Sequence, residues 1–188
     1  YDAVMRFVPF LEAQGFTVTL AADLAILDEP GFLNSQDLIV PCWTMGVLTE
    51  SQEACLVATV AQGVGLAGWH GGLCDAFRSS TTYQFMTGGQ FVAHPGNIID
   101  YSVRITQPDD PIVAGVGDFS VHSEQYYMHV DPANEVLATT TFDGTIHDWI
   151  DGVEMPVVWK RRHGAGRVFY SALGHVAQEF DHDSVYTM

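Results

Sequence analysis

Two histidines in the sequence stand beside glycines at the ends of apolar runs. His70 follows the run of residues 64–69, and His175 follows the run of residues 168–174. Glycine allows the backbone to turn sharply and leaves a neighbouring side chain open to a ligand. If both runs are parallel strands of one sheet, the two imidazoles lie in one crevice beyond the carboxyl ends of the strands. His70 and His175 are therefore the first candidates for a site, against the alternative that each is an ordinary structural histidine.

A carboxylate, a phenol and a third histidine could join this pair. In an extended strand, His122, Glu124 and Tyr126 share one face. Glu124 and Tyr126 side by side could orient a sugar hydroxyl, ligate a metal or act as acid and base. His94 precedes a proline after a short predicted strand and is a further neighbour. The alternatives are a solvated strand face for Glu124 and a structural turn residue for His94.

No cofactor is firmly implied by the sequence. Imidazole and carboxylate groups are the ligands of a divalent, zinc-type metal, and four residues could supply them: His70, His94, Glu124 and His175. No His-Glu-x-x-His spacing supports that interpretation. No Gly-x-Gly-x-x-Gly motif opens a predicted helix, which argues against a dinucleotide.

Nucleophilic catalysis has little support in the sequence. No Gly-x-Ser-x-Gly motif is present. Cys74 lies four residues after His70, within a predicted helix, and we interpret it as a small buried residue. A cysteine hydrolase that uses Cys74 is the weakest of the functional alternatives. His182, between two aspartates, is interpreted as an exposed loop residue.

The charge balance limits the partners. Seven lysines and arginines against 23 aspartates and glutamates give a formal net charge of −16. Nucleic acids and anionic membranes are bound through cations, so neither is an expected partner. Three cysteines without a Cys-x-x-Cys pair argue against a disulfide scaffold and suit a reducing cytoplasm. No apolar run reaches the roughly 18 residues of a membrane helix, and we expect a cytoplasmic protein.

The first half of the chain predicts alternating helices and strands. We expect helices at residues 2–14 and 50–63, the second opened by a capping box, and another at 73–86. Strands are expected at 16–20, at 37–40, where a buried strand is predicted, and at 64–68. A strand, a helix and a strand at this spacing form a βαβ unit with parallel strands. Because the chain opens in a helix and closes at the start of one, we expect a first strand and a last helix to be missing from it.

Residues 90–93 are expected to form a short extended piece, and a hairpin is expected to join 156–160 to 167–171 through Gly164 and Gly166. Between them, 99–105 predicts a strand with one solvent-exposed face, and 119–129 and 136–141 predict two more strands. These strands are expected to extend the sheet in antiparallel or mixed fashion. Without an internal repeat or a linker, residues 1–188 are expected to form one domain.

Motifs in four places, in this order, carry a family resemblance: residues 65–72, 88–95, 123–127 and 164–175. Together they resemble the ThuA-like (trehalose utilisation) family over roughly the last two thirds of the chain. The resemblance implies a class I glutamine amidotransferase-like fold. This is a flavodoxin-like, three-layer α/β sandwich with a mostly parallel central sheet and an antiparallel extension. That superfamily carries a cysteine nucleophile in a Gly-x-Cys-x-Gly turn, and here His70 occupies the cysteine's place. Glutaminase activity is therefore not expected.

Two hypotheses follow, and whether the protein is an enzyme stays open between them. The first is a cytoplasmic carbohydrate-utilisation protein that acts on a sugar or an oxidised sugar derivative. Its catalytic residues would be His70, Glu124 and His175, and its sugar-binding residues Trp69, Gly71, Gly72, His94 and Tyr126. The alternative is a non-catalytic sugar-binding or regulatory module on the same fold. The expected partner is a small-molecule carbohydrate, and a homo-oligomer is an open alternative to a monomer.

Overall fold

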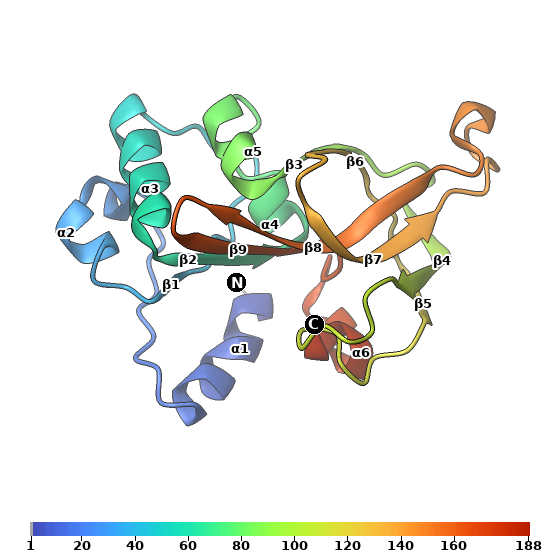
Figure 1. Cartoon of the computed structure of the whole chain (residues 1–188), viewed down its shortest axis with the longest axis horizontal. Coiled ribbons are helices and arrows are strands. Elements are labelled where there is room, and N and C mark those ends of the chain that lie inside the picture. Colours follow the sequence, from blue (N-terminus) through green and yellow to red (C-terminus); the bar gives the residue numbers. More distant parts are fainter. Residues whose placement is uncertain (1) are drawn as a thin grey trace.

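A mixed sheet of seven strands forms the centre of the computed structural model, which describes residues 2–188. The strand order is β1-β2-β9-β8-β7-β4-β5 (Figure 1). The strands span Leu38–Ile39 (β1), Gly65–Trp69 (β2), Ile98–Ile105 (β4), Phe119–Glu124 (β5), Glu135–Thr141 (β7), Glu154–His163 (β8) and Gly166–Ser171 (β9).

The α/β fold class is confirmed, but the sheet is mixed where a mostly parallel one was expected. β2 pairs in parallel with β1 and with β9, whereas the pairs from β9 through β8, β7 and β4 to β5 are antiparallel. The reason is that the second half of the chain returns by direct reversals, as in the β8–β9 hairpin, rather than by helical crossovers. The parallel part of the sheet is the part that the βαβ pattern predicted.

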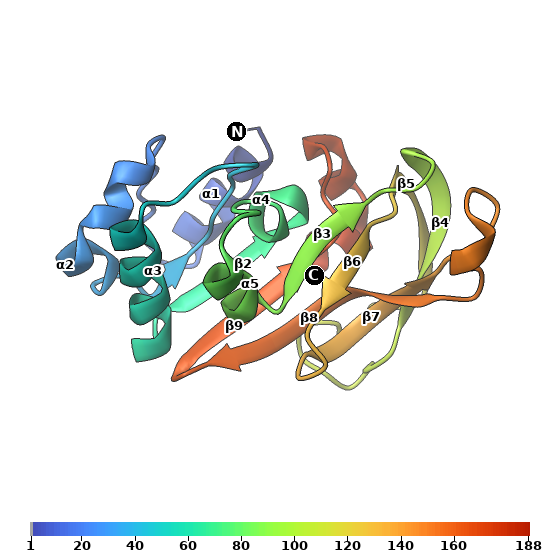
Figure 2. The same cartoon turned by 90° about the horizontal axis from the view of Figure 1, so that it is seen from above.

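Helices cover both faces of this sheet. On one side lie α3 (Glu50–Gln62), α4 (His70–Cys74) and α5 (Thr81–Thr87), and on the other α1 (Asp2–Ala13) and α6 (Asp183–Thr187) (Figure 1). A separate two-stranded sheet of β3 (Gly89–Ala93) and β6 (Tyr127–Val130) lies beside α4 and α5 (Figure 2). Short turns complete the fold: η1 (Leu24–Asp28), α2 (Pro30–Leu33), η2 (Asp148–Ile150) and η3 (Ala177–Asp181).

The predicted βαβ unit consists of β1, α3 and β2. The capping box is present, because Thr49 Oγ1 accepts from the Gln52 amide (3.2 Å) and Gln52 Oε1 accepts from the Thr49 amide (3.1 Å). Leu56 and Val60 on α3 are buried, and Leu38 of β1 is in parallel register with Gly65 of β2. The expectation that β1 is buried is wrong, since Leu38 is 37% exposed at the edge of the sheet.

Three predicted elements are corrected by the structure. Residues 16–20 form no strand and pair with none among residues 2–188, and Phe16 and Leu20 are 45% and 50% exposed. The helix predicted at 73–86 is two helices, because Ser80 caps a new one by accepting from the Tyr83 amide (2.9 Å). The strand predicted at 119–129 is two strands, since β5 pairs with β4 and β6 with β3.

The core lies between the sheet and the helices on both faces, and it includes Leu56 of α3 on one side and Val185 of α6 on the other (Figure 1). Trp159 of β8 and Tyr170 of β9 are fully buried with ring centroids 4.4 Å apart. Trp159 Nε1 donates to the Thr87 carbonyl (3.0 Å), and the Tyr170 hydroxyl donates to the His70 carbonyl (3.2 Å). The core therefore fixes the backbone at His70. No helix within residues 2–188 has the length and apolar composition needed to cross a bilayer.

The β8–β9 hairpin packs closely on the end of α3, and Gly166 makes that approach feasible. A Cβ atom there would collide with the backbone carbonyl oxygen of Val60. We predict that Gly166→Ala lowers the free energy of unfolding by about 1–3 kcal/mol, as overpacking does. The matched control is Gly117→Ala, where nothing lies within 4 Å and φ is not positive. Urea denaturation that gives both variants equal stability would contradict this account.

Candidate active site

His70 occupies the turn between β2 and α4. Its φ is +49°, in the left-handed region that residues other than glycine rarely adopt. The glycines around it make the turn sterically feasible, because a Cβ on Gly68 would lie 2.9 Å from Leu73 Cβ and one on Gly72 would lie 3.3 Å from Cys42 Cα. A strained residue held by its surroundings at a strand end is typical of functional sites.

His175 reaches the same place from β9. Because β2 and β9 are parallel, with Trp69 opposite Ser171, both strands end at the same edge of the sheet. The centroids of the imidazole rings of His70 and His175 are 5.1 Å apart, and the ring planes are inclined at 60°. The structure thus joins the two histidines that the sequence analysis paired.

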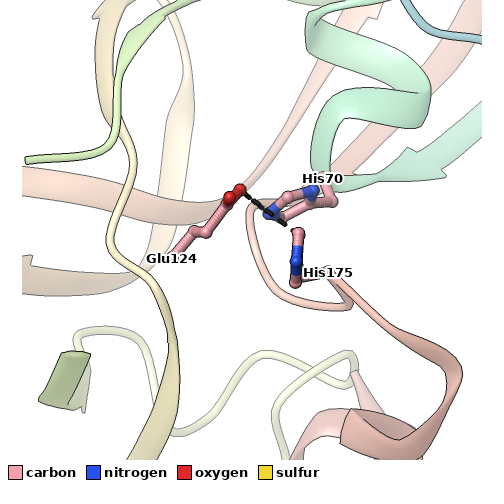
Figure 3. A group of neighbouring side chains, drawn as sticks. All are labelled: His70, Glu124 and His175. Atoms are coloured by element: carbon pink, nitrogen blue, oxygen red, sulfur yellow. Dashed lines mark ion pairs between the residues drawn. The ribbon is translucent and has the colours of Figure 1, made fainter. Parts of the chain in front are cut away.

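Glu124, the last residue of β5, completes the group (Figure 3). Its Oε2 lies 3.3 Å from His70 Nε2 and 3.3 Å from His175 Nδ1. Its Oε1 lies 3.7 Å from His94 Nε2. One carboxylate therefore faces three imidazoles, and the side chain of Glu124 is only 14% exposed.

Tyr126 holds the ring of His70. Its hydroxyl is 2.8 Å from His70 Nδ1, and the two ring centroids are 4.1 Å apart. Burial, and then the negative charge of Glu124, raise the pKa of Tyr126, so that it stays a phenol. The break between β5 and β6 directs Tyr126 to His70, while His122 lies outside the site in an exposed pair with Asp100 (2.8 Å). Of the three residues, only Glu124 and Tyr126 therefore line the cavity.

His70 is uncharged at neutral pH. Burial, and then the charges of His175 and His94, lower its pKa from 6.5 to about 3. His70 Nε2 is buried and has no hydrogen-bond partner within residues 2–188, although Glu124 lies 3.3 Å away. Because the contact lacks hydrogen-bond geometry and His70 is neutral, it is not an ordinary ion pair.

His70, Glu124 and His175 line a cavity of about 620 Å³. Its wall includes all eight residues that the sequence analysis selected: Trp69, His70, Gly71, Gly72, His94, Glu124, Tyr126 and His175. The indole of Trp69 also packs against Phe7 and Phe180, with centroids 5.1 and 5.6 Å away, so it supports the wall from behind. Gly71 leaves room for Tyr126, since a Cβ there would lie 3.3 Å from the tyrosine hydroxyl.

Residues that the sequence analysis did not select also shape the site. Glu179 accepts hydrogen bonds from the amides of Gly174 (2.9 Å) and His175 (3.1 Å) and from Ser123 Oγ (2.6 Å). It thereby ties the loop after β9 to the end of β5. The only feature of the sequence that could have pointed to Glu179 as a site residue is its position four residues after His175.

A second group missed from sequence lies on the cavity wall. Arg78 Nη2 donates to Asp75 Oδ2 (2.9 Å), and its guanidinium lies over the ring of Phe91, 5.4 Å from the centroid. The three-residue spacing of Asp75 and Arg78 is compatible with an ion pair. We did not select them because the sequence predicted one continuous helix over 73–86, whereas the two residues lie in the loop between two helices. Cys74 and His182 are respectively buried and exposed, as expected.

The fold and site define an α/β protein with a histidine at the sharp turn after a parallel strand and a carboxylate facing it. The chain belongs to the ThuA family, described as trehalose utilisation, whose model matches residues 1–188. This confirms the resemblance seen in the sequence. No curated protein matches the chain.

Solved structures agree on the fold. A thua-like protein from Bacteroides uniformis ATCC 8492 superposes with a TM-score of 0.80 at 16% identity, over 99% of this chain and 79% of that one. A second, from Parabacteroides merdae ATCC 43184, gives 0.64 at 17% identity, over 86% and 67%. A cytoplasmic protein from Salmonella typhimurium LT2 gives 0.65 at 13% identity, over 98% and 83%.

The buried thiol of Cys74 is predicted to be unreactive. Burial raises its pKa far above the ordinary value, whereas Cys42 is exposed and lines the cavity. Brief treatment with iodoacetamide followed by peptide mass spectrometry is expected to label Cys42 and to leave Cys74 unlabelled. Rapid labelling of Cys74 in the folded protein would instead support a cysteine nucleophile.

The depressed pKa of His70 predicts a loss of stability in acid. Between about pH 6.5 and pH 3 the unfolded chain binds a proton at this residue that the folded chain does not. The free energy of unfolding therefore falls with falling pH, by up to about 1.4 kcal/mol per pH unit from this residue. Above pH 6.5 both states carry neutral imidazole, and the residue adds no pH dependence.

The comparison is with His70→Asn, because asparagine tolerates a left-handed φ. Urea denaturation in EDTA at pH 7 and at pH 5 is expected to show a loss about 2 kcal/mol larger in the wild type than in the variant. Equal losses in the two proteins would show that His70 is protonated as readily in the folded chain as in the unfolded one.

Proposed function

We propose that this protein is a cytoplasmic carbohydrate-utilisation protein that acts on a sugar or an oxidised sugar derivative. His70, Glu124 and His175 carry the chemistry, and glutaminase activity is absent because a histidine occupies the turn that would hold the thiol. The observation that carries the proposal is the approach of one carboxylate oxygen to within 3.3 Å of a nitrogen of each histidine, at the wall of a cavity.

The cavity suits a neutral, hydroxyl-rich molecule. Its volume of about 620 Å³ is within the range of roughly 300–1,000 Å³ found for small-molecule sites. Among the described residues of its wall, Arg78 is the only arginine or lysine, and it is paired with Asp75, whereas Asp2 and Glu124 add negative charge. A phosphorylated sugar would meet this excess of carboxylates, so an uncharged sugar is favoured.

The walls also offer surfaces for a sugar ring. The rings of Phe91 and Tyr126 lie 4.6 Å apart on one side of the cavity. The apolar faces of sugars pack on aromatic rings, while carboxylate and guanidinium groups bind their hydroxyls. The family description, trehalose utilisation, points to the same class of substrate. The similar structure from Salmonella typhimurium LT2, described as a cytoplasmic protein, supports the proposed location.

Two roles for the three side chains are compatible with this function. Glu124 and the histidines could move protons at a sugar hydroxyl or at a carbon next to a sugar carbonyl. The same nitrogen and oxygen atoms could instead hold a divalent, zinc-type metal that polarises the sugar. Both roles require all three side chains.

The proposal predicts that catalysis depends on this group. Trehalose, a panel of other disaccharides and keto-sugars are screened by thermal shift, since a ligand of the native state raises Tm. Each sugar that raises Tm is then incubated with the protein, and products are detected by mass spectrometry. In His70→Asn and Glu124→Gln, turnover is expected to fall at least about 100-fold.

The matched control is His122→Asn. His122 lies on β5 two residues before Glu124, but it is exposed and outside the cavity wall. This variant should turn over sugar as the wild type does. Unchanged turnover in His70→Asn would refute the proposal. Sugar binding without turnover, lost in Glu124→Gln, would support the sugar-binding module instead of the enzyme.

A further inference from the structure

We propose that His70 Nε2, Glu124 Oε2 and His175 Nδ1 are the three protein ligands of a zinc-type divalent metal. The role of the metal in a reaction rests on the proposed function. The binding of the metal by these three residues does not depend on it. Each of the three residues offers a ligand atom within 4.8 Å of those of the other two (Figure 3). They come from the ends of three strands, β2, β5 and β9.

The unsatisfied nitrogen of His70 is the first argument. His70 is 7% exposed, and its Nε2 has no hydrogen-bond partner among the described residues. A buried polar atom without a partner is costly, and such atoms in folded proteins call for an explanation. This nitrogen lies 3.3 Å from Glu124 Oε2, the oxygen that is also 3.3 Å from His175 Nδ1. A cation bound by the three groups would satisfy all of them.

The spacing of the atoms is the second argument. Zinc binds histidine nitrogen and carboxylate oxygen at about 2.0–2.2 Å in tetrahedral sites, which places neighbouring ligand atoms about 3.3–3.6 Å apart. Both nitrogen-to-oxygen distances, at 3.3 Å, agree with that separation. Charge-assisted hydrogen bonds between the same groups would be shorter, at about 2.7–2.9 Å.

The support behind the two histidines is the third argument. Metal-binding histidines generally use their second ring nitrogen in a hydrogen bond that fixes the ring. His70 does this through Nδ1, which lies 2.8 Å from the Tyr126 hydroxyl. The backbone of His175 is fixed by its amide, which donates to Glu179 (3.1 Å). The ring of His70 and the backbone of His175 are thus held by groups outside the proposed ligand set.

The donor set selects the class of ion. Magnesium and calcium take oxygen ligands, whereas imidazole suits zinc and neighbouring transition metals. Two imidazoles and one carboxylate leave a fourth position for water or substrate, as in catalytic zinc sites. Glycines 71 and 72 and the other wall residues of the cavity surround the group, so a sugar there could reach that position. A metal would polarise a sugar carbonyl or hydroxyl bound to it.

The test uses the whole protein, stripped with EDTA and titrated with Co²⁺ while visible absorption is recorded. Cobalt substitutes for zinc and gives absorption bands that report its coordination. The expected result is one Co²⁺ per chain, displaced by Zn²⁺. His175→Ala should bind at least about 100-fold more weakly, while His122→Ala, which removes an exposed histidine paired with Asp100, should bind as the wild type does.

Tyr126→Phe is the second variant, because it keeps the ring and removes only the hydroxyl that orients His70. It should weaken Co²⁺ binding about 10–100-fold, as other changes behind a metal ligand do. Absence of stoichiometric binding, or equal affinity in the wild type and His175→Ala, would overturn the metal site. Sugar turnover by a protein that binds no Co²⁺ would overturn the metal site and leave the proposed function intact. Stoichiometric Co²⁺ binding by a protein that neither binds nor turns over any sugar would support the metal site and contradict the proposed function.

Discussion

The parallel pairing of β2 with β9 is the constraint on which the site depends. It places the ends of two strands, and with them His70 and His175, at the same edge of the sheet. The pairing is held by the core beneath it, where the hydroxyl of the fully buried Tyr170 on β9 donates to the carbonyl of His70. A shift of register by one residue would move each side chain to the opposite face and separate the two imidazoles. The positions of the two imidazoles at this edge of the sheet thus depend on backbone geometry that the buried core fixes.

Burial then gives the group its character. His70 is almost fully removed from water and is neutral, so that Glu124 faces an imidazole with a free nitrogen rather than a cation. The carboxylate in turn is placed by β5, which stands at the far end of the strand order from β1 and β2. Tyr126 and Glu179 join these distant parts, the first through the ring of His70 and the second through the backbone of His175.

Local patterns were sufficient where the physics is local. The capping box at Thr49 and the glycines of the β8–β9 hairpin act within a few residues of chain, and the elements they predicted are present. Sequence patterns gave wrong predictions where an element depends on a pairing partner that is distant in sequence or absent. Residues 16–20 alternate like a strand, yet a strand needs a neighbour, and none pairs with them in the described part of the chain. The helix expected at 73–86 was interrupted by Ser80, whose side chain begins a new helix.

The sequence by itself determined the βαβ unit, the sharp turn at His70, the candidacy of His175 and the family to which these motifs belong. Each of these depends on residue type and short spacing: glycine beside histidine, a capping pair, apolar runs of strand length. Only the tertiary structure decided that Glu124 meets both histidines, that Tyr126 orients His70 while His122 lies outside, and that Glu179 ties the loop of His175 to Ser123. Those contacts join residues dozens of positions apart, or depend on where a strand breaks. They are set by the order and curvature of the sheet, which no local pattern encodes.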